Sequence, residues 1–272
     1  MSAILEARGL SKSFGAVVAA ADINVTVDRD SVTGLIGSNG AGKTTFINMV
    51  TGYMKPAAGS IHFDGRDITQ LAPRRITQLG IARSFQIPQL FNSLAVRDNL
   101  LTAVGIVVAA ASRWAHGAIT RERAAPVTDE MLERFGLAAY RDKPAGVLPE
   151  GVRKLLDIAM ALVVKPRILL LDEPTSGVSA DEKYGIMDIV MTAVKADRVT
   201  VLFVEHDMDI VSRYAQRVLA FYDGRIIADG LPAAVLNEDE VRKYVIGEEL
   251  HEPQSRGPAC GDATGESSWP PT

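Results

Sequence analysis

The stretch GSNGAGKTT, residues 37 to 45, has the residue types and spacing that hold the phosphates of a nucleotide. It fits the pattern G-x-x-x-x-G-K-[ST] in full. Its glycines let consecutive backbone N–H groups converge on phosphate oxygens, and the helix that follows adds its dipole. Lys43 is expected to reach the β- and γ-phosphates, and the Thr44 hydroxyl to bind Mg²⁺. The loop residues predicted to contact the nucleotide are Gly37, Ser38, Asn39, Gly40, Ala41, Gly42, Lys43, Thr44 and Thr45.

Two acids at the end of the apolar run ILLLDEP are expected to complete this site. Asp172 ends a segment typical of a buried strand, where a carboxylate is costly unless a cation or water satisfies it. We predict that Asp172 holds Mg²⁺ and that Glu173 orients or deprotonates the attacking water of ATP hydrolysis. The alternative, two surface acids in a loop, agrees less well with a phosphate loop in the same chain.

Two further polar residues interrupt apolar segments. Gln86, in RSFQIPQLF, could contact both Mg²⁺ and the attacking water, and His206, at the end of VLFVEH, could contact the γ-phosphate. Taken singly, a loop glutamine is usually solvated and a histidine at a strand end is usually structural. These two assignments therefore depend on the other motifs.

The elements that must position these residues alternate between strands and helices, which predicts a mainly parallel α/β sheet. Antiparallel segments at the N-terminus are expected to cover one side of it. Strands are expected at 4–8, 17–27, 32–36, 167–174 and 199–206, with hairpins at 59–68 and 217–230. Helices are expected at 43–51, 76–80, 93–110, 128–137 with Thr128 as its cap, 151–164, 181–196 and 208–214.

Composition limits the classes of protein that this chain could be. Its 272 residues are 47% hydrophobic with a net charge of −4 and no dense run of Lys and Arg, which argues against a nucleic-acid partner. The lone Cys260 excludes an internal disulfide. The longest uncharged run, residues 99–112, falls short of the roughly 20 residues that a membrane span needs. Residues 251–272, rich in Pro, Gly and Ser, are predicted to form a disordered tail.

The order of these motifs resembles the ATP-binding cassette (ABC) subunits of membrane transporters. It runs from the phosphate loop through SFQ, a helix-opening L-x-x-G and LLLDEP to VEHD, and the resemblance covers residues 4 to about 248. Three stretches are most similar to the ATPase subunits of branched-chain amino-acid importers: GIARSFQIPQLFNSLAVRDNLL, VLFVEHDMDIV and VRKYVIGEE. The resemblance implies a P-loop ATPase domain over residues 1–250, with a helical subdomain at about 87–163.

The resemblance also implies roles for individual residues. ATP and Mg²⁺ are the expected cofactors, Phe14 is expected to stack on adenine, and Glu173 and His206 match the catalytic base and the switch histidine. Gln86 matches the loop that couples the nucleotide site to the permease. In this family two cassettes enclose two ATP molecules, and each site joins one phosphate loop to the other subunit's signature segment. Here the signature segment is LPEGV, residues 148–152, so Leu148 and Gly151 are expected to contact the partner's ATP.

The signature segment departs from the usual L-S-G-G-Q. Pro149, which suits a first helical position, removes a hydroxyl and an amide donor, and Glu150 brings negative charge toward an anion. Arg153 and Lys154 could offset Glu150 from one turn away. Ser179 stands where many cassettes carry Asp or Asn. The departure suggests that this chain contributes the weaker of two sites in a heterodimer with a second cassette, although a homodimer is also compatible with the sequence.

The expected partners are integral-membrane permease subunits and, indirectly, a periplasmic or extracellular substrate-binding protein. The expected location is the cytoplasmic face of the inner membrane. The alternatives within transport are a urea or amide importer and a lipopolysaccharide exporter, and outside transport a nucleotide-gated ABC scaffold protein. The resemblance implies that the permease and, in importers, the substrate-binding protein select the cargo.

Overall fold

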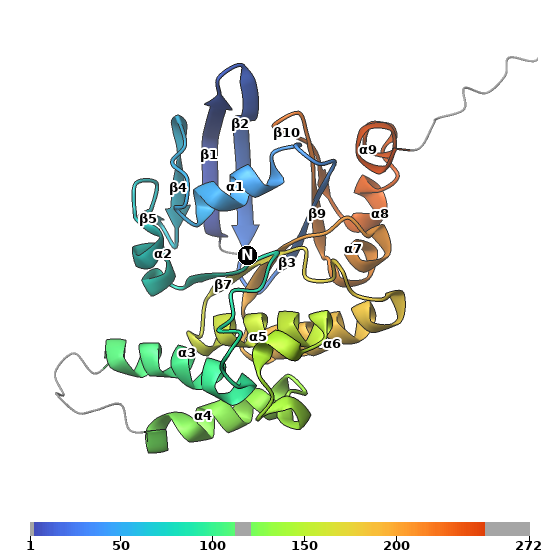
Figure 1. Cartoon of the computed structure of the whole chain (residues 1–272). Coiled ribbons are helices and arrows are strands. Elements are labelled where there is room, and N and C mark those ends of the chain that lie inside the picture. The colour runs from blue at the N-terminus through green and yellow to red at the C-terminus, as the bar shows by residue number, and fades with distance from the viewer. Residues whose placement is uncertain (1–2, 112–120, 248–272) are drawn as a thin grey trace, which may run out of the picture.

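The computed structural model of the chain describes residues 3–111 and 121–247, built on two sheets (Figure 1). The predicted disordered tail, 251–272, lies outside the described residues. One sheet is antiparallel, with strand order β2-β1-β4-β5, and the other has six strands in the order β10-β9-β3-β8-β7-β6. The antiparallel sheet comprises β1 (Ala3–Phe14), β2 (Val17–Asp28), β4 (Ala58–Phe63) and β5 (Arg66–Asp67). The second comprises β3 (Val32–Gly37), β6 (Ile81–Ser84), β7 (Ile168–Asp172), β8 (Thr200–Val204), β9 (Arg217–Tyr222) and β10 (Arg225–Gly230).

The six-stranded sheet confirms the prediction of a mainly parallel α/β fold. Strands β6, β7, β8, β3 and β9 run parallel, and β10 closes one edge as the antiparallel arm of a hairpin. The central strands are buried on both faces, as their continuous apolar sequences require. Alternate residues enter different clusters: Leu169 and Leu171 face one hydrophobic core, whereas Ile168 and Leu170 face the other.

The two cores lie on opposite faces of this sheet. Helix α1 (Lys43–Val50) packs between the two sheets through Phe46, Ile47 and Val50. On the other face lie α5 (Glu150–Val163), α6 (Ala180–Ala196) and α7 (Met208–Tyr214), together with α3 (Val96–Ala111) and α4 (Arg121–Arg134). Figure 1 shows α3 and α4 at the opposite end of the molecule from the antiparallel sheet.

The remaining described elements are short. They are α2 (Pro73–Leu79), the 3₁₀ turns Ala138–Tyr140 and Ala145–Val147, α8 (Pro232–Val235), α9 (Asp239–Val241) and a π-type turn at Arg242–Ile246. The hairpin predicted around Asp64 and Gly65 is confirmed, because both residues have positive φ, 52° and 74°, as a tight two-residue turn requires. No helix in residues 3–111 and 121–247 is both long and apolar enough to cross a membrane.

Two expectations about local structure were wrong, and one strand was missed. Thr128 does not cap a helix: α4 begins at Arg121, and the buried Thr128 hydroxyl donates to the Ala124 carbonyl inside it. Pro149 is the N-cap of α5 and not its first helical residue, and the helix begins at Glu150, one residue before the predicted start at 151. Strand β6 was not predicted, because four residues without alternation give no periodic signal and its partner β7 lies far along the chain.

Candidate active site

The phosphate loop connects β3 to α1 and has a backbone that only glycine fits at one position. Gly42, the N-cap of α1, has φ 106°, and a Cβ there would lie 2.5 Å from the Ala19 carbonyl oxygen of β2. The loop closes through a hydrogen bond from the Ala41 N–H to the Ser38 carbonyl, 3.2 Å. Strand β2 of the antiparallel sheet therefore lies so close to the phosphate loop that no side chain fits at Gly42.

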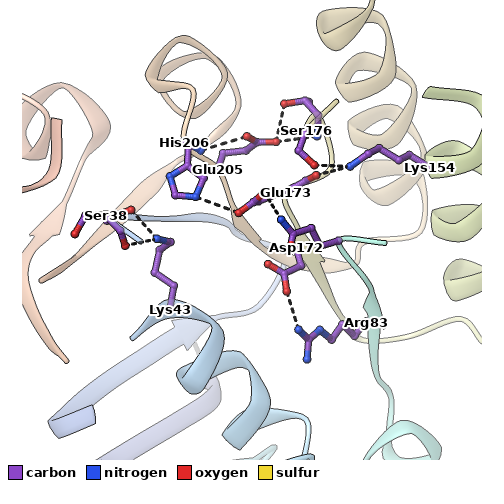
Figure 2. A network of polar contacts seen from close by, with 12 residues as sticks. Ser38, Lys43, Arg83, Lys154, Asp172, Glu173, Ser176, Glu205 and His206 are labelled. Atoms are coloured by element: carbon purple, nitrogen blue, oxygen red, sulfur yellow. Dashed lines mark hydrogen bonds and ion pairs between the residues drawn. The ribbon is translucent and has the colours of Figure 1, made fainter. Parts of the chain in front are cut away.

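Lys43 is buried in this loop, with 6% of its surface exposed. Its ammonium donates to the Gly37 and Ser38 carbonyls at 2.6 and 3.0 Å (Figure 2). Burial lowers the pKa of Lys43, and the nearby acids Glu173 and Asp172 oppose that shift. The structure thus brings the predicted phosphate-binding cation and both predicted acids into one site. The Lys43 ammonium can form charge-assisted hydrogen bonds to phosphate oxygens, which are stronger than bonds between neutral groups.

Asp172 ends β7, as predicted, and is paired with a cation that sequence reasoning missed. Arg83 of β6 donates to Asp172 Oδ2 at 2.7 Å and to Asn48 Oδ1 of α1 at 2.6 Å. Both members of the pair are almost fully buried, so the interaction is poorly screened. Nothing in the local sequence of Arg83 indicates this contact, because β6 itself was not predicted.

Glu173 lies where the Gln86 loop and the end of β8 meet. Gln86 Nε2 donates to Glu173 Oε2 at 2.7 Å, and His206 Nε2 lies 3.1 Å from Glu173 Oε1. The predicted catalytic residues Gln86 and His206 therefore both contact the Glu173 carboxylate directly. Each carboxylate oxygen has one polar partner, which orients the group and leaves it able to accept a proton from a water molecule.

The residues predicted to hold Mg²⁺ suit that ion chemically. Thr44 stands at the exposed start of α1, and Arg83 contacts Oδ2 of Asp172, so that Oδ1 is available to a metal or its water. Gln86 uses its amide nitrogen on Glu173, which leaves the amide oxygen as a donor. Mg²⁺ prefers such oxygen donors, and in nucleotide sites it is bound by one or two carboxylates together with substrate phosphates and water. No group of three or more His, Cys, Asp or Glu in the described part of the chain could form a dedicated cage.

The backbone after Glu173 is held from two sides. We call residues 173–176, Glu-Pro-Thr-Ser, the EPTS segment. Lys154 of α5 donates to the Glu173 carbonyl at 2.7 Å and to Ser176 Oγ at 2.9 Å. From the other side, Glu205 accepts hydrogen bonds from the Thr175 N–H and hydroxyl, at 2.9 and 2.7 Å (Figure 2). Burial raises the pKa of Glu205, and these hydrogen bonds oppose the shift.

The Gln86 loop is also anchored to α5. Asp157 accepts hydrogen bonds from the backbone N–H groups of Phe85 and Gln89, at 3.3 and 3.0 Å. Burial raises the pKa of Asp157, and the hydrogen bonds act against it. Sequence reasoning missed Asp157 and Glu205, and assigned Lys154 only to offsetting Glu150. Their helix and strand positions were predictable, but their partners come from distant segments.

The signature segment begins α5, as predicted, beside the EPTS segment. Gly151 packs on α6 so closely that a Cβ would lie 2.8 Å from Ile186 Cδ1, and Leu148 belongs to the core. Arg153 and Lys154 were expected to offset Glu150 from one turn away, but their hydrogen bonds go to other residues. Lys154 bonds the EPTS segment, and Arg153 lies 3.4 Å from Asn92 Oδ1. Burial lowers the pKa of Lys154, and Glu150 still acts on it through space as one of the acids that oppose this shift.

Phe14 lies at the end of β1, with 49% of its surface exposed. The Lys12 ammonium lies 5.7 Å from the centre of its ring. No hydrogen bond or ring contact among the described residues joins Phe14 to Lys43 or Glu173. An exposed flat ring is what the predicted stacking on adenine needs.

Comparisons with known proteins agree with this geometry. A family model described as "ABC transporter" matches residues 20–176. The high-affinity branched-chain amino acid transport ATP-binding protein BraF of Pseudomonas aeruginosa is 32% identical over 255 residues, covering 90% of this chain and 98% of the relative. A probable branched-chain amino acid transport ATP-binding protein, LivG of Archaeoglobus fulgidus, is 34% identical over 249 residues, covering 90% and 95%.

Solved structures agree as well. MJ1267, an ATP-binding cassette of an ABC transporter in its ADP conformation, superimposes with a TM-score of 0.79 at 32% identity, covering 91% of this chain and 100% of that one. The phosphate loop, the acids that face Lys43 and the similarity over nearly the whole length of these proteins lead to one conclusion. The chain belongs to the ABC transporter family, as an ATP-binding and ATP-hydrolysing subunit.

Proposed function

We propose that this chain is the ATPase subunit of an importer of branched-chain amino acids. The observation that carries the ATPase role is the Glu173 carboxylate, held by Gln86 and His206 beside the buried Lys43. The relatives named for branched-chain amino acid transport support the cargo, because they align with this chain over almost their full length. No specific observation favours the alternatives, which are a urea or amide importer, a lipopolysaccharide exporter and a non-transport scaffold.

The geometry suggests how the residues divide the reaction. Lys43 and the phosphate-loop amides bind the β- and γ-phosphates, while Phe14 stacks on the base. Glu173 takes a proton from the attacking water, and His206 and Gln86 fix the direction of its two oxygens. When bound through Thr44, Asp172 and Gln86, Mg²⁺ supplies positive charge that stabilises the transferring phosphoryl group. Because the Gln86 loop contacts Glu173, a movement of that loop changes the catalytic geometry.

The structure offers a place where a permease can act on that loop. A groove of about 210 Å³ runs beside strand β6 and the start of the Gln86 loop. Its aromatic members Tyr53 and Phe85 meet edge to face, with ring centres 5.9 Å apart, and Tyr53 is 60% exposed. The groove residues are Thr51, Tyr53, Thr77, Ile81, Ala82, Arg83, Phe85, Ala161 and Val164. We infer that a permease segment docks here and moves the Gln86 loop.

This assignment places the subunit at the membrane through its partner. The helices from α3 to α5 lie within the proposed helical subdomain, about 87–163. An external substrate-binding protein acts only indirectly, through the permease. The location that follows is the cytoplasmic face of the inner membrane.

Uptake by cells tests the cargo. Deleting the gene in its source cell is expected to abolish ATP-dependent uptake of radiolabelled leucine, isoleucine and valine, while urea uptake stays unchanged. The wild-type gene is expected to restore uptake and the Glu173→Gln gene is not. Normal uptake of all three amino acids in the deletion strain, with loss of urea uptake, would contradict the cargo and favour the amide importer.

The signature segment suggests an unequal pair of ATP sites. Pro149 has no side-chain hydroxyl and no N–H, and Glu150 adds an acid at the first turn of α5, where the partner's γ-phosphate would lie. We infer that this chain pairs with a second, distinct cassette and supplies the weaker signature. The double substitution Pro149→Ser, Glu150→Gly removes a negative charge and restores a hydroxyl, and is then expected to raise ATP turnover of the assembled transporter roughly tenfold, which corresponds to a barrier lower by about 1.4 kcal/mol.

Steady-state ATP hydrolysis of the assembled transporter measures this. The two single variants separate the effect of the acid from the effect of the missing hydroxyl. Glu150→Gly is expected to give the larger part of the increase in turnover. Turnover equal to wild type in the double variant would remove the support for unequal sites. Vigorous turnover by the purified chain alone, absent in Glu173→Gln, would show that two copies form working sites and would favour the homodimer.

A further inference from the structure

Lys154 is a buried cation whose contacts join two functional segments. It lies in the second turn of α5, with 4% of its surface exposed. Its ammonium donates to the Glu173 carbonyl and to Ser176 Oγ, at 2.7 and 2.9 Å (Figure 2). A buried lysine is costly unless it is paired or hydrogen-bonded, so the two bonds account for its position. They connect the helix of the signature segment to the residue that carries the catalytic carboxylate.

The backbone at Glu173 needs such support. Glu173 has φ 50°, in the left-handed region that residues other than glycine rarely occupy. A conformation of this kind persists only where the surroundings hold it, and it is common at catalytic sites. The Lys154 ammonium holds the carbonyl of this residue, and Glu205 holds Thr175 two residues later. Because the carbonyl and the side chain share one α-carbon, displacing the first redirects the second.

Helix α5 reaches both catalytic elements from one face. Lys154 and Asp157 are three residues apart, so they lie on the same side of the helix. Lys154 holds the EPTS segment, and Asp157 holds the backbone of the Gln86 loop. Gly151, one turn before Lys154, packs tightly against α6. A shift of the start of α5 therefore reaches Glu173 through the direct Lys154 contact, and reaches Gln86 through the backbone of its neighbour Phe85.

We propose that Lys154 is a positioning residue that makes the geometry of Glu173 in one ATP site depend on the signature segment of the same subunit, which engages the other site. This inference rests on the proposed function, in which two cassettes enclose two nucleotides. When ATP in the second site draws the start of α5 into place, Lys154 carries the displacement to the Glu173 carbonyl. Hydrolysis in the first site then proceeds fastest when the second is occupied.

Charge makes the position sensitive to the type of substitution. Burial lowers the pKa of Lys154, and the carboxylates of Glu150, Glu205, Glu173 and Asp157 oppose that shift. Methionine matches the length of lysine but removes both hydrogen bonds and the positive charge. Arginine keeps the charge and the donors. Ser176→Ala removes one of the two contacts without disturbing the charge, and therefore serves as the milder probe.

The test is ATP turnover of the assembled transporter as a function of ATP concentration, for wild type, Lys154→Met, Lys154→Arg and Ser176→Ala. The exposed Lys195→Met, in the last turn of α6, is the matched control. For Lys154→Met we expect kcat to fall about 100-fold, as for a misplaced catalytic group, with KM nearly unchanged and the Hill coefficient reduced toward one. Lys154→Arg is expected to recover most of kcat and of the cooperativity, and Ser176→Ala to show the same loss in smaller measure.

The outcomes separate this inference from the proposed function. If the wild-type transporter does not hydrolyse ATP, both the proposed function and the role of Lys154 are overturned. A cooperative wild type, with Lys154→Met equal to Lys195→Met in kcat and Hill coefficient, would overturn the role of Lys154 alone. If Lys154→Met does not fold, Ser176→Ala decides: a reduced kcat and Hill coefficient support the role, and an unchanged Hill coefficient rejects it. A merely structural residue would lower thermal stability and leave the Hill coefficient as it is.

Discussion

Replacing Glu173 by glutamine should reduce ATP turnover by about 10²- to 10⁴-fold while ATP binding is retained, the range by which a general base accelerates a reaction. The amide has the size of the carboxylate, so its contacts with Gln86 and His206 can largely be kept. It cannot take a proton from water. Because the change removes a step of the reaction and no contact to phosphate, the loss should appear in kcat and leave the affinity for ATP intact.

Two measurements on the same preparation check this. Phosphate release gives turnover, and calorimetric titration with Mg-ATP gives the dissociation constant. Glu133→Gln, an exposed acid on α4, is the matched control and should behave as wild type. If Glu173→Gln keeps more than a tenth of the wild-type turnover, Glu173 is not the base.

Replacing Lys43 by methionine should weaken ATP binding roughly ten- to hundredfold, because a hydrogen bond to a charged group contributes about 1.5–3 kcal/mol. Turnover should fall further than binding, since the ammonium also offsets the charge of the transferring phosphoryl group. Lys43 is buried against the Gly37 and Ser38 carbonyls, so a side chain of similar length should still fill its place.

The same titration and turnover assay, with thermal unfolding of the nucleotide-free chain, measure this prediction. Lys195→Met again controls for loss of a lysine at a distance. A folded Lys43→Met protein that binds ATP as tightly as wild type would mean that Lys43 serves the loop and not the nucleotide. A variant that fails to fold would show that its bonds to the loop carbonyls are structurally essential.

The short-range features of the site were predictable from the chain alone. The phosphate loop was identified because its glycines serve a local backbone requirement, as Gly42 with φ 106° shows. Asp172 and Glu173 were identified because carboxylates at the end of a buried apolar strand are costly unless a cation or water satisfies them. The contact of Gln86 and His206 with Glu173 agrees with their predicted shared role. Thr128 was misplaced because its hydroxyl matches a helix cap equally well in sequence and bonds inside a helix in the fold.

By itself, the sequence determined the nucleotide chemistry, the parallel sheet and the family, because these depend on residue type and on spacing over a few residues. Only the tertiary structure decided which partner each buried charge has. Arg83 is 89 residues from Asp172, Lys154 is 22 from Ser176, and Glu205 is 30 from Thr175. A buried charge is costly without a partner, but which residue becomes the partner depends on how the strands and helices pack. The connection from the signature helix to the catalytic carboxylate is therefore a property of the packing.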